Sequence, residues 1–122
     1  MARVLLLTDD IWVESEVRAA LTDPGTVIET TSDPETITDA VSRHQADVAV
    51  IDLQVRSMGG MAVVRELRAA MENGYIPEVR MVLLLDRRAD DFLARRAGAD
   101  AYVVKPFTAQ QLRQAVSLPA EV

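Results

Sequence analysis

Short apolar runs alternate along the chain with longer segments in which apolar residues recur at helical spacing. In the segment Ile11–Leu21, for example, Val13 and Val17 fall on one face of a helix together with Leu21. The apolar runs predict strands at Val4–Thr8, Thr26–Thr31, Asp47–Leu53, Val79–Leu85 and Ala101–Val104. The intervening segments predict helices at Ile11–Leu21, from an N-cap at Ser32 to about His44, and at Met61–Glu72, Ala89–Ala97 and Thr108–Ser117.

This regular alternation favours parallel strands joined by crossover helices that cover both faces of one sheet. The pattern therefore predicts an α/β fold with a doubly wound, five-stranded parallel sheet in a (βα)5 order. No internal repeat, low-complexity segment or linker interrupts the pattern before residue 118. We expect a single domain over residues 1–122, with a core at about 3–117 and a C-terminal tail at 118–122.

Composition narrows the class of protein further. Apolar residues make up 49% of the chain and charged residues 26%, which is typical of a soluble domain, and the absence of cysteine excludes disulfides and thiolate metal sites. The net charge of −6 argues against nucleic-acid binding, which needs a basic surface. The longest apolar runs, such as Met81–Leu85, are too short to span a membrane, and the N-terminus shows no signal-peptide pattern. We therefore expect a cytoplasmic protein.

Ionisable residues stand at the ends of three of the predicted strands. Asp9 and Asp10 follow the first strand, Asp52 lies at the end of the third, and Lys105 follows the fifth. The carboxyl ends of parallel strands lie along one edge of the sheet, where open α/β sheets bind their ligands. The sequence therefore predicts that three carboxylates and one ammonium group converge at this edge.

Three neighbouring carboxylates repel one another, because two unit charges about 4 Å apart interact by roughly 4 kcal/mol at an effective dielectric constant near 20. A hard divalent cation relieves this repulsion, and Mg²⁺ suits a site with few carboxylates, several waters and a phosphate. A carboxylate beside such an ion, here Asp52, can attack a phosphoryl group and form an aspartyl phosphate. Lys105 would then neutralise the phosphoryl oxygens.

Each of these residues also has a purely structural interpretation. Asp9 or Asp10 could cap the helix that follows. Asp52 could form a turn at the end of its strand, and Lys105 could lie on the surface in a turn before Pro106. The functional interpretation is favoured by the joint occurrence of these residue types at three appropriate strand ends.

Four motifs follow one another along the chain: Thr8-Asp9-Asp10 after the first strand, Asp52 after Val-Ala-Val-Ile, Met58-Gly59-Gly60 before the third helix, and the segment Ala97–Phe107. Each motif is weak alone, but their order and spacing together are specific. On these motifs the chain resembles the receiver domains of two-component response regulators over essentially its whole length. The resemblance implies a flavodoxin-like fold and a signalling domain rather than an enzyme, at most capable of its own phosphorylation and dephosphorylation.

The resemblance also assigns roles to individual residues. It implies that Asp52 accepts the phosphoryl group and that Lys105 contacts that group. Asp9 and Asp10 are the implied Mg²⁺-binding pair, and Asp52 and the backbone carbonyl of Gln54 are the implied further ligands. The implied phosphoryl donor is a phosphohistidine on a sensor histidine kinase, and the implied output is binding of an unknown downstream protein.

The switch region departs from the family pattern. The resemblance implies a cis Lys105–Pro106 bond and gives Tyr102 the position of the switch aromatic, whose rotamer follows phosphorylation. Receivers usually place Ser or Thr at the end of the fourth strand, where the hydroxyl bonds a phosphoryl oxygen, but the equivalent position here is Leu85 or Asp86. Neither side chain can donate that bond, and Asp86 would repel phosphate if it pointed there. We therefore expect phosphorylation to occur but Tyr102 to couple to it weakly or by another route.

This departure motivates an alternative function, a receiver-like interaction module that recognises partners independently of phosphorylation. A Mg²⁺-dependent phosphohydrolase is disfavoured, because such enzymes typically need a second Asp two residues after the nucleophile and Gln54 cannot deliver a proton.

The face formed by the fourth helix, the fifth strand and the fifth helix is the implied contact surface for a partner or a homodimer. The pairs Arg87-Arg88 and Arg95-Arg96 form a local basic group that could make salt bridges there.

Overall fold

The computed structural model describes residues 2–54 and 59–117. Its strands are β1 (Ala2–Leu7), β2 (Thr26–Thr31), β3 (Val48–Asp52), β4 (Arg80–Leu85) and β5 (Ala101–Val104). They form one sheet in the order β2-β1-β3-β4-β5, in which every neighbouring pair is parallel. The predicted α/β fold with a five-stranded, doubly wound parallel sheet of the flavodoxin-like type is confirmed.

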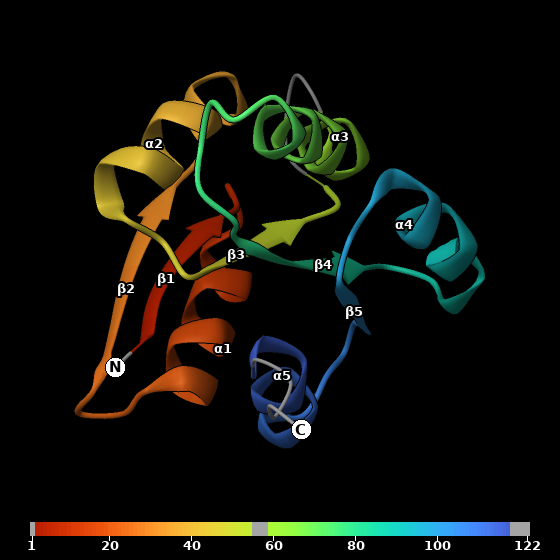
Figure 1. The fold of residues 1–122 in the computed structure, drawn as a ribbon. Helices are drawn as coiled ribbons and strands as arrows, with labels where there is room; N and C mark the ends of the chain where they lie inside the picture. The colour runs from red at the N-terminus through yellow and green to blue at the C-terminus, as the bar shows by residue number, and fades with distance from the viewer. Residues whose placement is uncertain (1, 55–58, 118–122) are drawn as a thin grey trace, which may run out of the picture.

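Helices cover both faces of this sheet (Figure 1). They are α1 (Ile11–Leu21), α2 (Ile37–His44), α3 (Gly60–Glu72), α4 (Asp91–Ala97) and α5 (Ala109–Val116). Helices α1 and α5 lie on one face, whereas α2, α3 and α4 lie on the other. In the ranges 2–54 and 59–117, no helix combines the length and the apolar character needed to cross a membrane.

The two faces explain why the central strands are almost entirely apolar. All five residues of β3 are buried, and successive side chains point to opposite faces of the sheet. Leu5 and Leu83 belong to the core cluster beneath α2, α3 and α4. Their neighbours Leu6 and Leu84 belong to the cluster beneath α1 and α5. A sheet buried on both faces leaves its edge at the strand ends as the place where a ligand can reach it.

Two helix starts differ from the sequence-based prediction. Asp33, not Ser32, accepts the capping bond, from the backbone N–H of Glu35 at 3.0 Å. The capped segment, η1 (Pro34–Thr36), is a 3₁₀ turn, and α2 begins only at Ile37. The fourth helix likewise opens with a 3₁₀ turn, η2 (Arg88–Asp90), ahead of α4. Both corrections concern first turns, where 3₁₀ geometry is common.

The expected tail at 118–122 lies outside the described residues.

The backbone at the start of α3 lies in close contact with the backbone at the end of β3. A Cβ atom added at Gly60 would lie 2.7 Å from the carbonyl oxygen of Asp52 and 2.8 Å from the Cα of Leu53. The backbone N–H of Gly60 donates to the carbonyl oxygen of Leu53 at 3.0 Å. Only glycine allows this approach of two backbones, so Gly60 fixes where α3 meets the strand that carries Asp52.

Candidate functional site

Asp52 is the last residue of β3 and is only 1% exposed. Both of its carboxylate oxygens accept hydrogen bonds from the protein. Oδ2 accepts from the hydroxyl of Thr8 at 2.8 Å. Oδ1 accepts from Nζ of Lys105 at 2.5 Å and from the backbone N–H of Gln54 at 3.2 Å. A buried carboxylate is stable only when its charge is compensated in this way, and here the compensation comes from residues of three different strand ends or loops.

Lys105 lies between two carboxylates. Its Nζ is 2.5 Å from Oδ1 of Asp52 and 3.3 Å from Oδ1 of Asp86. Its backbone N–H donates to the carbonyl oxygen of Leu85 at 2.8 Å, which ties the loop after β5 to the end of β4. The Lys105–Pro106 peptide bond is cis, as the resemblance implied.

The electrostatic surroundings keep the Lys105 side chain charged. Burial acts to lower the pKa of Lys105, but the hydrogen bond and the charge of Asp52, followed by those of Asp86, outweigh burial and raise the pKa above its ordinary value. The ammonium group is therefore a fixed positive charge at the edge of the sheet at neutral pH.

Leu85 and Asp86, the two candidates for the position at which receivers usually carry Ser or Thr, have different surroundings. Leu85 is fully buried in the core beneath α3 and α4. Asp86, in contrast, has a side chain that is 33% exposed and that contacts Lys105. An acidic side chain therefore reaches the site from this loop, at the position where a hydroxyl residue was expected from the family pattern.

The acidic pair after β1 lies at the same edge of the sheet but is exposed. Oδ1 of Asp10 accepts a hydrogen bond from the backbone N–H of Trp12 at 2.8 Å and so caps α1. The capping interpretation therefore holds for Asp10. The hydroxyl oxygen of Thr8 accepts from the backbone N–H of Asp10 at 3.1 Å. A cavity of about 370 Å³ opens beside this pair, and Asp9, Asp10 and Glu14 are among its lining residues.

The structure brings together some of the predicted site residues but not all of them. Asp52 and Lys105 are in direct contact, and Asp86 joins them. Asp9, Asp10 and Asp52 do not form a common ligand group: in the part of the chain that the structure describes, no three Asp, Glu, His or Cys side chains are placed to hold one ion. The available donors are nevertheless all oxygens. Because Mg²⁺ keeps several waters and is usually bound through one or two carboxylates, this donor set suits a hydrated Mg²⁺.

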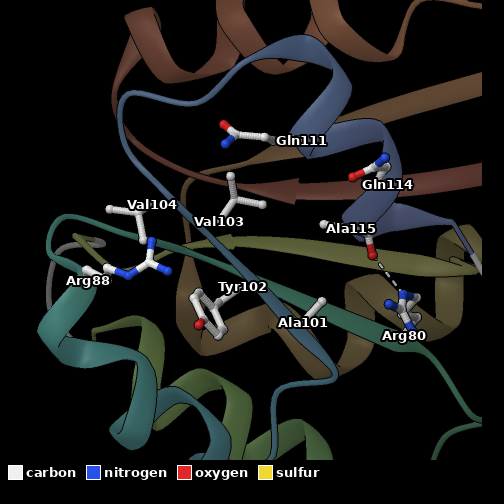
Figure 2. A pocket seen from close by; sticks show the side chains of 9 residues that line it. All are labelled: Arg80, Arg88, Ala101, Tyr102, Val103, Val104, Gln111, Gln114 and Ala115. Atoms are coloured by element: carbon white, nitrogen blue, oxygen red, sulfur yellow. Dashed lines mark hydrogen bonds between the residues drawn. The ribbon is translucent and has the colours of Figure 1, made fainter.

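Tyr102 is directed toward α4 and not toward Asp52. Its hydroxyl donates to Oδ2 of Asp91 at 3.3 Å. Its ring lines an open groove of about 430 Å³ along β5, together with the side chains of Arg88 and Gln111 (Figure 2). The side chain expected to act as a switch is thus hydrogen-bonded to α4, a helix of the expected contact surface.

Thr8 belongs to a motif quoted from the sequence, but the sequence analysis assigned it no role in the site. It is 3% exposed and bridges the two acidic segments, since its hydroxyl donates to Asp52 and accepts from the backbone of Asp10. The register pairs Leu7 with Ile51, which places Thr8 beside Asp52. A polar residue at the end of a buried apolar run was the available signal, but its partner depends on the strand register, which the sequence pattern does not fix.

Residues 4–117 match the response regulator receiver domain family. The chain therefore belongs to this family, whose members are phosphoacceptor signalling domains rather than enzymes in the ordinary sense. It is 33% identical over 113 residues to the two-component response regulator PhoP of Pseudomonas aeruginosa, covering 90% of this chain and 48% of PhoP. It is 29% identical over 114 residues to the response regulator protein PmrA of the same species, covering 93% of this chain and 50% of PmrA. The chain thus spans about half the length of these curated relatives.

Solved structures show the same fold. A putative response regulator from Chloroflexus aurantiacus superposes with a TM-score of 0.82 at 19% identity, covering 94% of this chain and 93% of that one. The receiver domain of a sensor histidine kinase from Pseudomonas aeruginosa superposes with a TM-score of 0.78 at 24% identity and the same coverage. In that second structure a magnesium ion is coordinated in the active-site cleft.

Proposed function

We propose that this chain accepts a phosphoryl group on Asp52 from a phosphohistidine of a sensor histidine kinase, in a Mg²⁺-dependent reaction, and signals by binding a downstream protein. The observation that carries the proposal is the contact between the buried Asp52 carboxylate and Lys105 at 2.5 Å, at the end of a central parallel strand. A nucleophilic carboxylate and a fixed positive charge for the incoming phosphoryl oxygens are two of the groups that such a transfer needs from the protein.

The two oxygens of Asp52 have different partners. Oδ2 accepts from the hydroxyl of Thr8, whereas Oδ1 accepts from Lys105 and from the backbone N–H of Gln54. An oxygen of this carboxylate attacks phosphorus. As the new O–P bond forms, the P–N bond of the donor phosphohistidine breaks and its electron pair returns to the imidazole. Lys105 then neutralises an oxygen of the transferred group.

A Mg²⁺ ion that keeps several of its waters would be bound directly by one or two of the proposed ligands, which are Asp9, Asp10, Asp52 and the backbone carbonyl of Gln54, and through its waters by the others. When bound, the ion supplies positive charge for the phosphoryl oxygens during transfer.

A small phosphoryl donor tests the proposal without knowledge of the kinase. The protein is incubated with acetyl phosphate and Mg²⁺ and its intact mass is measured. We expect the mass of one added phosphoryl group in the wild type, loss of that gain in Asp52→Asn, and an unchanged gain in Asp39→Asn. Asp39 makes an exposed ion pair with Arg43 on α2 and serves as the charge-matched control. No gain, or a gain that survives Asp52→Asn, contradicts the proposal.

The face formed by α4, β5 and α5 is the proposed surface for a downstream protein or a second copy of the chain. The groove in Figure 2 runs along this face and carries Arg88. Two other arginines are already paired within the chain, Arg87 with Asp90 at 3.1 Å and Arg95 with Asp91 at 3.8 Å. Sedimentation of the protein with and without beryllofluoride, which mimics the phosphoryl group, tests whether the chain forms a homodimer. A monomer under both conditions contradicts the proposed homodimer.

A further inference from the structure

Asp86 has no task in the proposed phosphoryl transfer, yet its carboxylate lies in the site. Oδ1 of Asp86 is 3.3 Å from Nζ of Lys105, which also contacts Asp52. The side chain of Asp86 is 33% exposed, so it reaches this position from the loop after β4 and not from the core. In the unphosphorylated protein, Lys105 thus forms ion pairs with two carboxylates.

We infer that Asp86 is an electrostatic brake on this receiver: its carboxylate opposes phosphorylation of Asp52 by repelling the incoming phosphoryl group and by competing for Lys105. The inference rests on the proposed function and concerns how that same site is regulated.

The sign of the effect follows from the charges. The phosphoryl group carries roughly two negative charges and becomes attached to the Asp52 carboxylate, which Lys105 contacts. Asp86 contacts the same ammonium group, so its charge repels the phosphoryl oxygens and withdraws part of the compensation that Lys105 provides. Solvent reaches Asp86 and weakens the repulsion, which limits the expected effect to that of one partly exposed charge pair.

The chemistry that is slowed is the formation of the acyl phosphate. With acetyl phosphate as donor, a carboxylate oxygen of Asp52 attacks phosphorus, the bond between phosphorus and the acetyl oxygen breaks, and acetate leaves with the electron pair. Negative charge accumulates beside Lys105 in this step, and Asp86 therefore raises the barrier relative to the free protein and donor.

The test compares initial rates of phosphorylation by acetyl phosphate at saturating Mg²⁺, followed by intact mass. Asp86→Asn removes the charge at nearly constant shape, Asp86→Glu retains the charge, and Asp39→Asn removes the charge of an exposed ion pair on α2. We expect Asp86→Asn to react roughly two- to fivefold faster than the wild type. Asp86→Glu is expected to stay closer to the wild type than Asp86→Asn does, and Asp39→Asn to match the wild type.

The outcomes separate the brake from the proposed function. If Asp86→Asn reacts no faster than the wild type while the mass gain still requires Asp52, the brake is wrong and the proposed function stands. If no variant gains mass, both fail. Raising the ionic strength provides a second readout, because the rate advantage of Asp86→Asn is expected to shrink as salt screens the repulsion. An advantage that does not change with salt overturns the electrostatic cause.

Discussion

Two carboxylates at the same edge of the sheet have opposite environments. Asp52 is 1% exposed and accepts hydrogen bonds from Thr8, Lys105 and the backbone of Gln54. Asp10 is exposed and accepts a bond from the backbone N–H of Trp12. The buried carboxylate is fixed in one orientation by three donors, whereas the exposed one is held by the helix it caps. Residue type and strand position suggest a site, but burial and hydrogen-bond partners distinguish Asp52, the proposed nucleophile, from Asp10, a proposed ligand of a hydrated ion.

The largest effect is expected from removing the positive charge beside the buried carboxylate. Lys105→Met leaves Asp52 buried without its cation, and we expect a loss of about 3 kcal/mol in the free energy of unfolding, together with loss of phosphorylation. Asp52→Asn is expected to cost less, because Lys105 is 21% exposed and keeps Asp86 as its partner. Urea unfolding of both variants measures which one loses more free energy of unfolding. A smaller loss for Lys105→Met than for Asp52→Asn contradicts the importance of this ion pair for the buried site.

The raised pKa of Lys105 predicts how this contribution depends on pH. A group whose folded-state pKa is raised stabilises the protein fully below its unfolded-state pKa and loses that contribution as pH rises through the folded-state pKa. The difference in unfolding free energy between the wild type and Lys105→Met is therefore expected to stay constant between about pH 7 and pH 9, and to decline only above about pH 10.5. Urea unfolding of the wild type and Lys105→Met at a series of pH values from about 7 to above about 10.5 tests this pH dependence. A decline that begins near neutral pH indicates a lowered pKa and a different environment.

Substitution of Thr8 is expected to have the next largest effect on the free energy of unfolding. It tests the role of the hydrogen bond to Oδ2 of Asp52. Thr8→Val removes the hydroxyl at nearly constant shape and leaves Oδ2 without this donor, which is expected to cost about 2 kcal/mol. Thr8→Ser keeps the hydroxyl and is the matched control. We expect Thr8→Val to slow phosphorylation by acetyl phosphate and Thr8→Ser to recover most of the rate. Equal rates for the two variants imply that the hydroxyl does not orient the carboxylate.

Asp10 gives the smallest expected effect on stability and separates helix capping from ion binding. Asp10→Asn can still cap α1 and is expected to unfold like the wild type, whereas Asp10→Ala loses about 1 kcal/mol. Both substitutions are expected to weaken Mg²⁺ binding. Trp12, the one tryptophan of the chain, lies two residues from Asp10 and is 76% exposed, so its fluorescence can report a Mg²⁺ titration. Wild-type affinity in Asp10→Asn argues against Asp10 as a ligand.

Much of this molecule is predictable from the sequence because its strands are buried on both faces and its helices are amphipathic. The predicted bounds of α1, β2 and β5 agree with the structure, and the strand ends that carry Asp52 and Lys105 bring them together as expected. The positions that escaped prediction depend on three-dimensional detail. The role of Thr8 depends on strand register, and the approach of Asp86 to Lys105 depends on the path of a loop. Local periodicity contains neither kind of information.

The central claim is that the carboxylate held by Lys105 and Thr8 is the one that accepts the phosphoryl group. Peptide mapping by mass spectrometry after treatment with acetyl phosphate and Mg²⁺ measures this directly. We predict that the added phosphoryl group is found on the peptide that contains Asp52 and fragments to that residue. A phosphoryl group located on Asp9, Asp10 or His44 instead, or on no residue at all, contradicts the account.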